Sequence, residues 1–522
     1  MSATLLRGGT VFDGTGEPGV PADVLVRGTT IEQVGPALQA PNDATVVDLT
    51  GRYVVPGLID VHTHDDVAIL RPSGTEPKLR QGVTTGVVGN CGHGCAPSAP
   101  GGYLSDYSAP VLGAFPDTRW PSFADYLDDI AASGRNLHVA ALVPHAPLRT
   151  AVLGPCRRPA TAGEVPRIAG LLDEALGAGA AGLSVGLMYA PGNAATPAEL
   201  HALARVLARH GKPLVAHLRS EGDAIEDSLA EVVDVARRAG CPLHLSHLKV
   251  VSPRNAGRMP ALVAILDAHR ADGIDITADA YPYPAGSTTV SALFPAWAVD
   301  RGVTGLLDAL GAPATRRRVL ADLRRPWKEL ENNYLALGPE RIRLVGLSRT
   351  ELDGRTLAEL AGDTDPAECL ADLVLAERAA LSVILFQSDE RDLRAALSWP
   401  WTMIGSDGLP VAGGAVHPRL YGTFPRVLAR YADRLPGLSF AQAVHRMTGL
   451  PAHRFGLAGR GSLVPGAAAD VTVVDPALLA DTATFDDPRR FPTGIAVALL
   501  DGRPTADRTG RLLRVRRSGA TR

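Results

Sequence analysis

Apolar runs alternate with amphipathic stretches from about residue 55 to 455. A helix is expected at 165–177 before a strand at 181–185, and another helix at 197–210 before a strand at 213–217. This alternation predicts a parallel sheet whose strands are joined by crossover helices. The length of the region suits a (β/α)8 barrel of about 250 residues or more, enlarged by insertions. We therefore predict an α/β protein built on a TIM-like barrel.

The alternation lapses at about 286–345, and we place the main insertion there. Two later runs compete for the seventh strand of the barrel, 274–278 and 381–386. Both are short and apolar, so the sequence leaves the choice between them open.

The two ends of the chain differ from its middle. Residues 1–55 and 456–522 contain short strands, such as 23–27 and 469–475, and these strands are separated by Gly, Pro and Asp turns. Two β-rich ends around an α/β middle predict one small β-sandwich assembled from both ends. The predicted barrel then spans 56–455.

Composition excludes several classes of function. A formal net charge of −3 gives no electrostatic reason to bind nucleic acid or an anionic membrane. The N-terminus has no basic-then-apolar signal sequence, and no run approaches the roughly 20 apolar residues of a membrane span. The five cysteines are an odd number in a long chain, which argues against a disulfide framework. We expect a cytoplasmic protein with a small-molecule partner.

The run Val61-His62-Thr63-His64 follows an apolar stretch, 53–60, that is predicted to be a short buried strand. Side chains alternate between the faces of a strand, so His62 and His64 point the same way. Two imidazoles on one face at the end of a strand form half of a site for a divalent metal.

Four later strand ends carry further candidate metal ligands: Cys91, His217, His247 and Asp407. Taken singly, each has an ordinary alternative. A lone His at a strand end is commonly a hydrogen-bonded polar residue, a lone Cys a small buried hydrophobe, and an Asp before Gly a turn former. Barrel enzymes carry their chemistry at the carboxyl ends of the strands, and zinc accepts imidazole, thiolate and carboxylate. Six such residues in this order predict a site for one or two zinc ions.

These motifs resemble the amidohydrolase superfamily and, within it, the D-aminoacylase/N-acyl-D-amino-acid deacylase family. The resemblance covers nearly the whole chain and rests on these stretches: Pro56-Gly57-Leu58-Ile59-Asp60-Val61-His62-Thr63-His64, Gln81-Gly82-Val83-Thr84-Thr85, Gly89-Asn90-Cys91-Gly92, Gly182-Leu183-Ser184, His217-Leu218-Arg219-Ser220-Glu221, Ser246-His247-Leu248-Lys249, Tyr281-Pro282-Tyr283, Gly405-Ser406-Asp407-Gly408, His417-Pro418-Arg419, Tyr421-Gly422-Thr423-Phe424, Arg460-Gly461-Ser462 and Pro465-Gly466 with Ala469-Asp470.

The resemblance implies a ligand set. One zinc would lie on Cys91, His217 and His247. A second, weaker position would use His62, His64 and Asp407, with Cys91 able to bridge. In the family the cysteine replaces a carboxylated lysine of dihydroorotases and hydantoinases, and the predicted fourth strand at 181–186 indeed offers no lysine.

The resemblance also implies a reaction, the hydrolysis of N-acyl-D-amino acids, and its preference for D substrates rests on the resemblance alone. Asp407 is the candidate general base, because one carboxylate can take a proton from water and deliver it to the leaving amine. The residues implied around the substrate carboxylate and pocket are Lys249, Tyr283, Arg419, Ser287 and Tyr189. For Arg419 and Lys249 the alternative is an ordinary structural charge.

Two stretches depart from the family pattern. The run His93-Gly94-Cys95-Ala96-Pro97 follows the metal-site cysteine, and it is an extra ligand set, a reshaped pocket wall or an idle loop. We favour the pocket wall, because the ligand set is already complete. Pro144-His145-Ala146 stands where the family usually has Gly-His-Gly. Both departures bear on the substrate more than on the hydrolytic chemistry.

Three other functions compete. A cyclic-amide hydrolase of the hydantoinase or dihydroorotase kind would use the same chemistry at the carbonyl. One-metal deaminases place a glutamate three residues after the fifth-strand His, but here that position is Ser220 and the glutamate is Glu221. A non-catalytic scaffold would lack ligands, and none of the six is missing.

Overall fold

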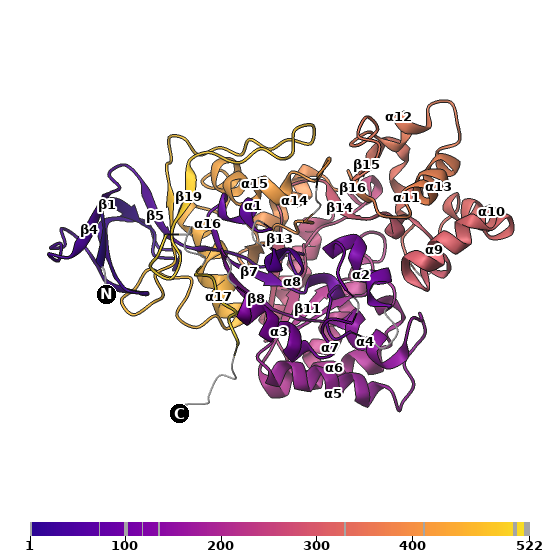
Figure 1. Ribbon diagram of the computed structural model, residues 1–522, viewed down its shortest axis with the longest axis horizontal. Helices are drawn as coiled ribbons and strands as arrows, with labels where there is room; N and C mark the ends of the chain where they lie inside the picture. Colours follow the sequence, from indigo (N-terminus) through magenta and orange to yellow (C-terminus); the bar gives the residue numbers. More distant parts are fainter. Residues whose placement is uncertain are drawn as a thin grey trace.

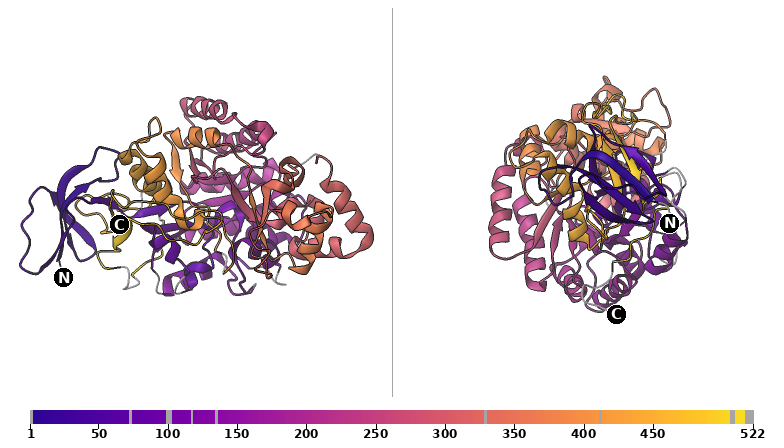
Figure 2. Two further views of the ribbon diagram at one scale, coloured as in Figure 1. Left: turned by 90° about the horizontal axis from the view of Figure 1, so that it is seen from above. Right: turned by 90° about the vertical axis from the view of Figure 1, so that its left-hand side faces the viewer.

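The molecule is elongated, with a β domain at one end, a barrel in the middle and a helical insertion at the other end (Figures 1 and 2). This computed structural model describes residues 3–71, 74–98, 103–116, 118–133, 136–327, 330–410, 413–504 and 509–515. None of the helices described in these ranges is both long enough and apolar enough to cross a membrane.

Short parallel strands form the barrel. In chain order they are β6 (Leu58–Asp60), β7 (Val83–Val88), β8 (His138–Ala141) with its continuation β9 (Val143–Pro144), β10 (Leu183–Gly186), β11 (Leu214–His217), β12 (Leu243–Leu245), β13 (Ile276–Ala280) and β17 (Thr402–Ile404). Strands β6, β7 and β8 pair in that order, and β9 to β13 pair in order up to β17. The barrel closes just beyond β6 and β17, where Asp407 N donates to His62 O at 2.7 Å and Thr63 forms a parallel bridge with Gly408. The predicted barrel is confirmed.

Amphipathic helices cover the outside of the barrel. They include α3 (Phe123–Ala132), α4 (His145–Leu153), α5 (Val165–Gly177), α6 (Pro197–His210), α7 (Ile225–Ala239), α8 (Met259–Ala271) and α14 (Glu390–Ser398). Helix α6 shows why its ends could be predicted. The Thr196 side chain caps its first turn by accepting from Glu199 N, Pro197 occupies the first helical position, and Gly211 ends the helix at φ 62°. Leu203 and Leu207, one turn apart, are fully buried against the sheet.

The seventh strand is β13, because it pairs in parallel with both β12 and β17. The competing run forms β16 (Ser382–Leu385), which pairs antiparallel with β14 (Gly286–Thr289) and β15 (Ile342–Val345) in a separate sheet. Helices α9 (Gly302–Gly311), α10 (Pro313–Leu323), α11 (Asn333–Leu337), α12 (Leu357–Ala361) and α13 (Pro366–Ala376) complete this insertion around an apolar core of their own. The insertion therefore extends beyond the predicted limit at residue 345, to the end of β16.

Strands from both ends of the chain form the β domain. They are β1 (Ala3–Val11), β2 (Val20–Arg27), β3 (Thr30–Gly35), β4 (Ala44–Asp48), β5 (Tyr53–Pro56), β18 (Val471–Val474) and β19 (Ile495–Leu499), and they make one connected seven-stranded sheet. β18 from the C-terminal part pairs antiparallel with β5 from the N-terminal part. The apolar run at 53–60 is thus shared: β5 belongs to this sheet and β6 to the barrel.

Helices near the ends of the barrel complete the structure: α1 (Glu76–Leu79), α2 (Leu104–Leu112), α15 (Arg419–Arg426), α16 (Phe440–Met447) and α17 (Gly449–Phe455). A buried ionic cluster joins the barrel to the β domain. Asp470, next to β18, lies 3.1 Å from His138 Nε2 on β8 and pairs with Arg460, whose Nη2 reaches Asp501 at 3.1 Å. Asp501 N also donates to Asp470 at 2.9 Å.

We predict that Asp470→Asn destabilises the fold by roughly 3–5 kcal/mol, because it removes the charge that compensates buried cations. Burial opposes the charged form, but His138 and Arg460 outweigh it and lower the pKa of Asp470 to about 2. Because that pKa lies below the value of about 3.9 for an unfolded Asp, the stabilisation is present above about pH 4 and is lost as the pH falls towards 2. Urea unfolding at pH 7 and pH 3 measures the difference. The control is Asp128→Asn, which breaks an exposed pair with Arg514 and should cost less than about 1 kcal/mol.

Candidate metal centre

All six candidate ligands lie at the carboxyl ends of barrel strands. His62 and His64 follow β6, Cys91 lies in the short 3-10 helix η2 (Asn90–Gly92) after β7, and His217 is the last residue of β11. His247 and Asp407 follow β12 and β17. Each of the six residues is at most 6 % exposed. The structure therefore brings every predicted ligand to one buried end of the barrel.

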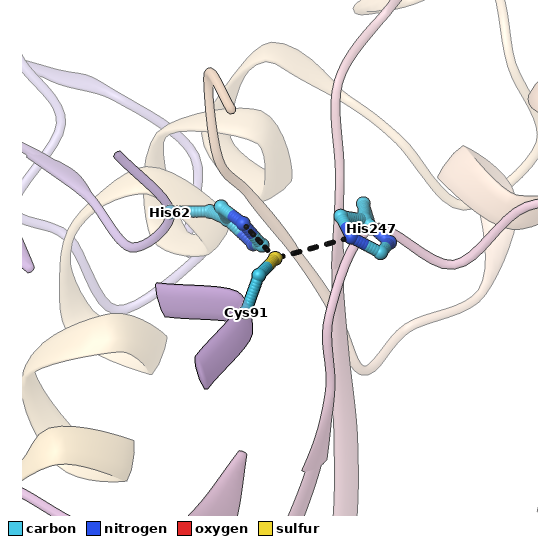
Figure 3. Close-up of side chains that lie close together, drawn as sticks. All are labelled: His62, Cys91 and His247. Carbon is cyan, nitrogen blue, oxygen red and sulfur yellow. Dashed lines mark hydrogen bonds between the residues drawn. The ribbon is translucent and has the colours of Figure 1, made fainter. Parts of the chain in front are cut away.

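The ligand atoms converge on Cys91. Its Sγ lies 3.2 Å from His62 Nε2 and 3.4 Å from His247 Nε2, so the thiol is held between two imidazoles (Figure 3). His217 Nδ1 lies 2.8 Å from His247 Nε2, and His64 Nε2 lies 3.2 Å from an oxygen of Asp407. Two triads, His62–Cys91–His247 and His62–His64–Asp407, each have their ligand atoms within 4.8 Å of one another.

This donor set fits a zinc site. Nε2 of His217 and Nδ1 of His64 are buried and have no hydrogen-bond partner among the described residues. Buried polar atoms are rarely left without a hydrogen-bond partner. A bound ligand would therefore explain why these two nitrogens have none among the described residues. Imidazole and thiolate donors crowded together with unpaired nitrogens are what a bound Zn²⁺ would satisfy.

The backbone is strained at three of these positions. Cys91, His247 and Asp407 adopt φ values of 53°, 36° and 49°. Residues other than glycine seldom occupy this left-handed region, and strain of this kind concentrates where function requires a side chain to be aimed. The flanking glycines permit the close packing involved: a Cβ on Gly92 would lie 2.6 Å from Gly186 N.

Charges around Cys91 favour the thiolate. Burial alone would raise the pKa of the Cys91 thiol, but the charges of His62 and His247 hold it well below its usual value. Burial likewise opposes ionisation of Asp407, yet Arg419 and His62 hold the pKa of that carboxyl well below its usual range. The site thus presents a thiolate and a carboxylate, the forms that bind metal.

Two carboxylates orient the candidate histidines, and both escaped the sequence prediction. Asp279 Oδ2, on β13, lies 3.1 Å from His62 Nδ1 and 3.0 Å from His244 Nε2, while its Oδ1 accepts from His247 N at 2.9 Å. Glu221 Oε1 lies 2.9 Å from His247 Nδ1. Both ring orientations leave Nε2 facing Cys91. Two features of the sequence could have indicated these carboxylates: Asp279 is an acidic residue inside an apolar strand, and Glu221 lies four residues after His217.

A pocket opens beside these ligands, and four predicted substrate contacts line it: Lys249, Arg419, Ser287 and Tyr189. Arg419 Nη1 lies 2.9 Å from an oxygen of Asp407, and its Nη2 donates to Ser287 O at 2.9 Å. Lys249 Nζ donates to Glu221 at 2.7 Å. Tyr189 OH lies 3.1 Å from the Thr288 hydroxyl.

Tyr283 was predicted at the substrate, and the structure places it elsewhere. Its hydroxyl donates to Asp481 at 3.3 Å, and it is absent from the pocket lining. Tyr281 lines the pocket instead, with the Arg419 guanidinium 4.6 Å from its ring centroid. The strand ends at Ala280, and Tyr283 N then donates to Tyr281 O, so a three-residue turn separates the two rings. Strand alternation therefore no longer applies here.

In the unusual run after Cys91, His93 lies at the pocket and Cys95 lies in the apolar core. His93 lines the pocket, and its ring centroid lies 4.8 Å from that of Tyr189. Burial and the charge of His64 lower the pKa of His93 to about 3. Cys95 packs in the apolar core instead. His145 begins α4 and bonds to Glu199 at 2.8 Å.

Comparison with known proteins extends these findings. Residues 45–506 match the model of a family described as the amidohydrolase family. The chain is 38% identical to a D-aminoacylase of Alcaligenes xylosoxydans xylosoxydans over 98% of this chain and 97% of that protein. It is 39% identical to an N-acyl-D-glutamate deacylase of the same organism, covering 98% and 96%.

The chain belongs to the amidohydrolase family. The structure of an N-acyl-D-glutamate deacylase from Bordetella bronchiseptica, in complex with zinc and a phosphonate mimic of the tetrahedral intermediate, superposes with a TM-score of 0.83 at 35% identity, covering 98% of this amidohydrolase and 99% of that chain. A D-aminoacylase structure concerned with a binuclear metal centre superposes with a TM-score of 0.81 at 36% identity, with the same coverage. A D-hydantoinase from Thermus at 14% identity shares the fold, with a TM-score of 0.55.

For this amidohydrolase we predict that Asp279→Asn weakens zinc binding roughly 10- to 100-fold, because the ring of His62 loses the carboxylate that orients it. Competition with a chromogenic chelator measures the affinity. Asp392→Asn is the matched control, since Asp392 is also buried but accepts from Gly257 N and Met259 N rather than from a candidate ligand. Equal zinc affinities in the two variants would contradict an orienting role for Asp279.

Proposed function

We propose that this chain is a zinc-dependent hydrolase that cleaves N-acyl-D-amino acids into a carboxylate and a free amino acid. The observation that carries the proposal is the buried thiolate of Cys91 between two imidazoles, beside a carboxylate that is paired with Arg419. The similarity to a D-aminoacylase and to D-amino-acid deacylases over nearly the whole chain supports the linear amide and the D configuration.

The rival functions have less support. Structures of hydantoinases share only the fold, at 14% identity. A deaminase glutamate is absent from position 220, and Glu221 is committed to His247 and Lys249. A scaffold would have no need for the strained backbone at Cys91, His247 and Asp407.

Cys91, His217 and His247 would hold one zinc ion, and His62, His64 and Asp407 a second. When bound, zinc supplies Lewis acidity that polarises the amide carbonyl and makes water more acidic. All of these ligands are nearly inaccessible to solvent, so a bound substrate would exclude bulk water from the reacting atoms.

Asp407 moves the protons in the proposed mechanism. Its low pKa means that it is a carboxylate at neutral pH, the form that a base requires. It takes one proton from the water molecule that adds to the carbonyl carbon. It then delivers this proton to the amide nitrogen as the C–N bond breaks, which yields a carboxylic acid and an amine and restores the carboxylate.

Arg419 positions the substrate in this proposal. Its guanidinium is 1 % exposed, stacks on Tyr281 and bridges Asp407 and Ser287. A planar guanidinium binds a carboxylate through two parallel hydrogen bonds, so a substrate carboxylate beside Asp407 would bind there with its amide next to the base. Lys249, Ser287 and Tyr189 complete the proposed pocket wall, and Tyr281 replaces Tyr283.

Amine release from N-acetyl-D-leucine and N-acetyl-L-leucine, with zinc content measured on the same sample, tests the proposal. We expect D-selective release that is lost after chelation and is restored by zinc. N-acetyl-D-leucinamide should react roughly 10- to 100-fold more slowly, since it lacks the charge that Arg419 binds. Ring opening of dihydrouracil, with no amine released from either acetylated amino acid, would instead indicate a cyclic-amide hydrolase.

Asp407→Asn should retain one zinc per chain and lose roughly 10²- to 10⁴-fold in kcat, because the proposed first zinc position does not use this residue while both proton transfers do. Steady-state kinetics and metal analysis on one preparation provide the check. Turnover within a few-fold of the wild type, at full zinc content, would remove Asp407 from the role of base.

A further inference from the structure

A second chamber adjoins the reaction pocket. It shares four lining residues with that pocket: His93, Met188, Tyr189 and Glu331. Its other walls are largely apolar and come in good part from the insertion, through Phe294, Val299, Trp327 and Leu330. A substrate held at the metal centre therefore has room to extend one arm past Glu331.

At this junction, one of the two carboxylate oxygens of Glu331 has no hydrogen-bond partner among the described residues. Its Oε1 accepts from Asp223 N at 2.7 Å and from the Ser220 hydroxyl at 2.9 Å. Its Oε2 accepts no hydrogen bond from the described residues, and the side chain forms no ion pair with any of them. Burial raises the pKa of Glu331, and the charges of nearby Glu221 and Asp223 raise it further.

The cations in the pocket lining already have partners. Lys249 pairs with Glu221 at 2.7 Å, and Arg419 pairs with Asp407 at 2.9 Å. The second chamber adds one more acid, Asp106, and its described lining contains neither Lys nor Arg. Among the described residues, the two linings thus offer Glu331 no Lys or Arg that is not already paired, and a partly buried carboxylate in such surroundings is stabilised by an incoming cation.

We propose that Glu331 selects substrates in which the arm that passes it carries an ammonium or guanidinium group. This inference rests on the proposed function, and it names the class of substrate. The aliphatic stem of such an arm would pack on Met188, Phe294 and Leu330, and its cationic end would meet Oε2 of Glu331 and the aromatic faces of Tyr189 and Trp327. An acidic side chain, such as that of an N-acyl-D-glutamate, would be repelled.

A purely structural role for Glu331 is the alternative. The carboxylate joins the insertion to the loop before α7, and the Ser220–Asp223 contacts alone would explain its burial. Glu331→Gln separates the two roles, because an amide oxygen still accepts both hydrogen bonds while the charge is gone. A structural role predicts no change in substrate preference with this variant.

Two matched pairs of substrates test the proposal on the zinc-loaded enzyme. N-acetyl-D-arginine and N-acetyl-D-citrulline have side chains of equal length, of which only the first is charged. N-(4-aminobutyryl)-D-leucine and N-pentanoyl-D-leucine make the same comparison on the acyl arm. We expect a kcat/KM ratio of roughly tenfold or more for the charged member of one pair, as for a hydrogen bond to a charged group, and the pair that shows it identifies the arm.

In Glu331→Gln that ratio should fall to about one. Glu368→Gln is the control: Glu368 pairs with Arg316 on the insertion, outside both pockets, and the ratio should be unchanged. Ratios near one for both pairs in the wild type, or a ratio that survives in Glu331→Gln, would overturn the proposal.

Binding of the products separates this proposal from the proposed function. Calorimetry compares D-arginine with D-citrulline, and 4-aminobutyrate with pentanoate, on the wild type and Glu331→Gln. If N-acetyl-D-leucine and both pairs are inert, the proposed function fails, but a roughly tenfold Glu331-dependent preference for one charged product would still support the cation site. Equal binding of charged and neutral products would reject it.

Discussion

Closure of the barrel between its first and last strands determines where the candidate ligands meet. Asp60, at the end of β6, accepts from Ser406 N at 2.8 Å and from His62 N at 3.2 Å. The buried Lys78 lies 2.7 Å from the same carboxylate. His62 and His64 follow this joint on one strand and Asp407 on the other. A buried carboxylate with fewer partners would be costly, so the network holds the two strand ends in one register.

The site built on this joint holds imidazoles, a thiol and a carboxylate close together before any metal is considered. Imidazole nitrogens lie within 3.5 Å of Cys91 and Asp407, and three of the six candidate ligands are held in the left-handed region of backbone space. Such an arrangement persists only where its surroundings overdetermine it. Asp279 and Glu221 do part of this work, since each binds the ring nitrogen of a histidine on the side away from Cys91. The geometry of the ligands is thus a property of the whole barrel mouth.

Local rules predicted the parts of this structure that depend on local interactions. The limits of α6 follow from its capping residues and those of α5 from its apolar periodicity. The six candidate ligands follow from their positions at strand ends. Local rules could not decide whether β13 or β16 is the seventh strand of the barrel, because both are short and apolar. Only their pairing differs: β13 pairs in parallel with β17, and β16 pairs antiparallel with β15. Tyr281 and Tyr283 are separated by a turn at Pro282, and the proline marks the turn without showing which of the two rings faces the pocket. Asp279 contacts His62, which is 217 positions away in the sequence, and Glu331 contacts Ser220, which is 111 positions away. The roles of these two carboxylates could therefore be recognised only from the folded structure.

In the proposed function, the barrel would carry the reaction and the insertion would contribute to substrate selectivity. The candidate metal ligands and the proposed base all follow barrel strands, whereas much of the second chamber, with Glu331, comes from a segment that has its own sheet and its own apolar core. Residues in that segment can change with little effect on the closure at Asp60 or on the orientation of His62. Relatives named D-aminoacylase, N-acyl-D-glutamate deacylase and N-acyl-D-aspartate deacylase match this chain at 38%, 39% and 35% identity, so overall identity does not distinguish between these three classes of relative. An acidic residue in the wall of that chamber is therefore informative about the substrate in a way that the metal centre is not.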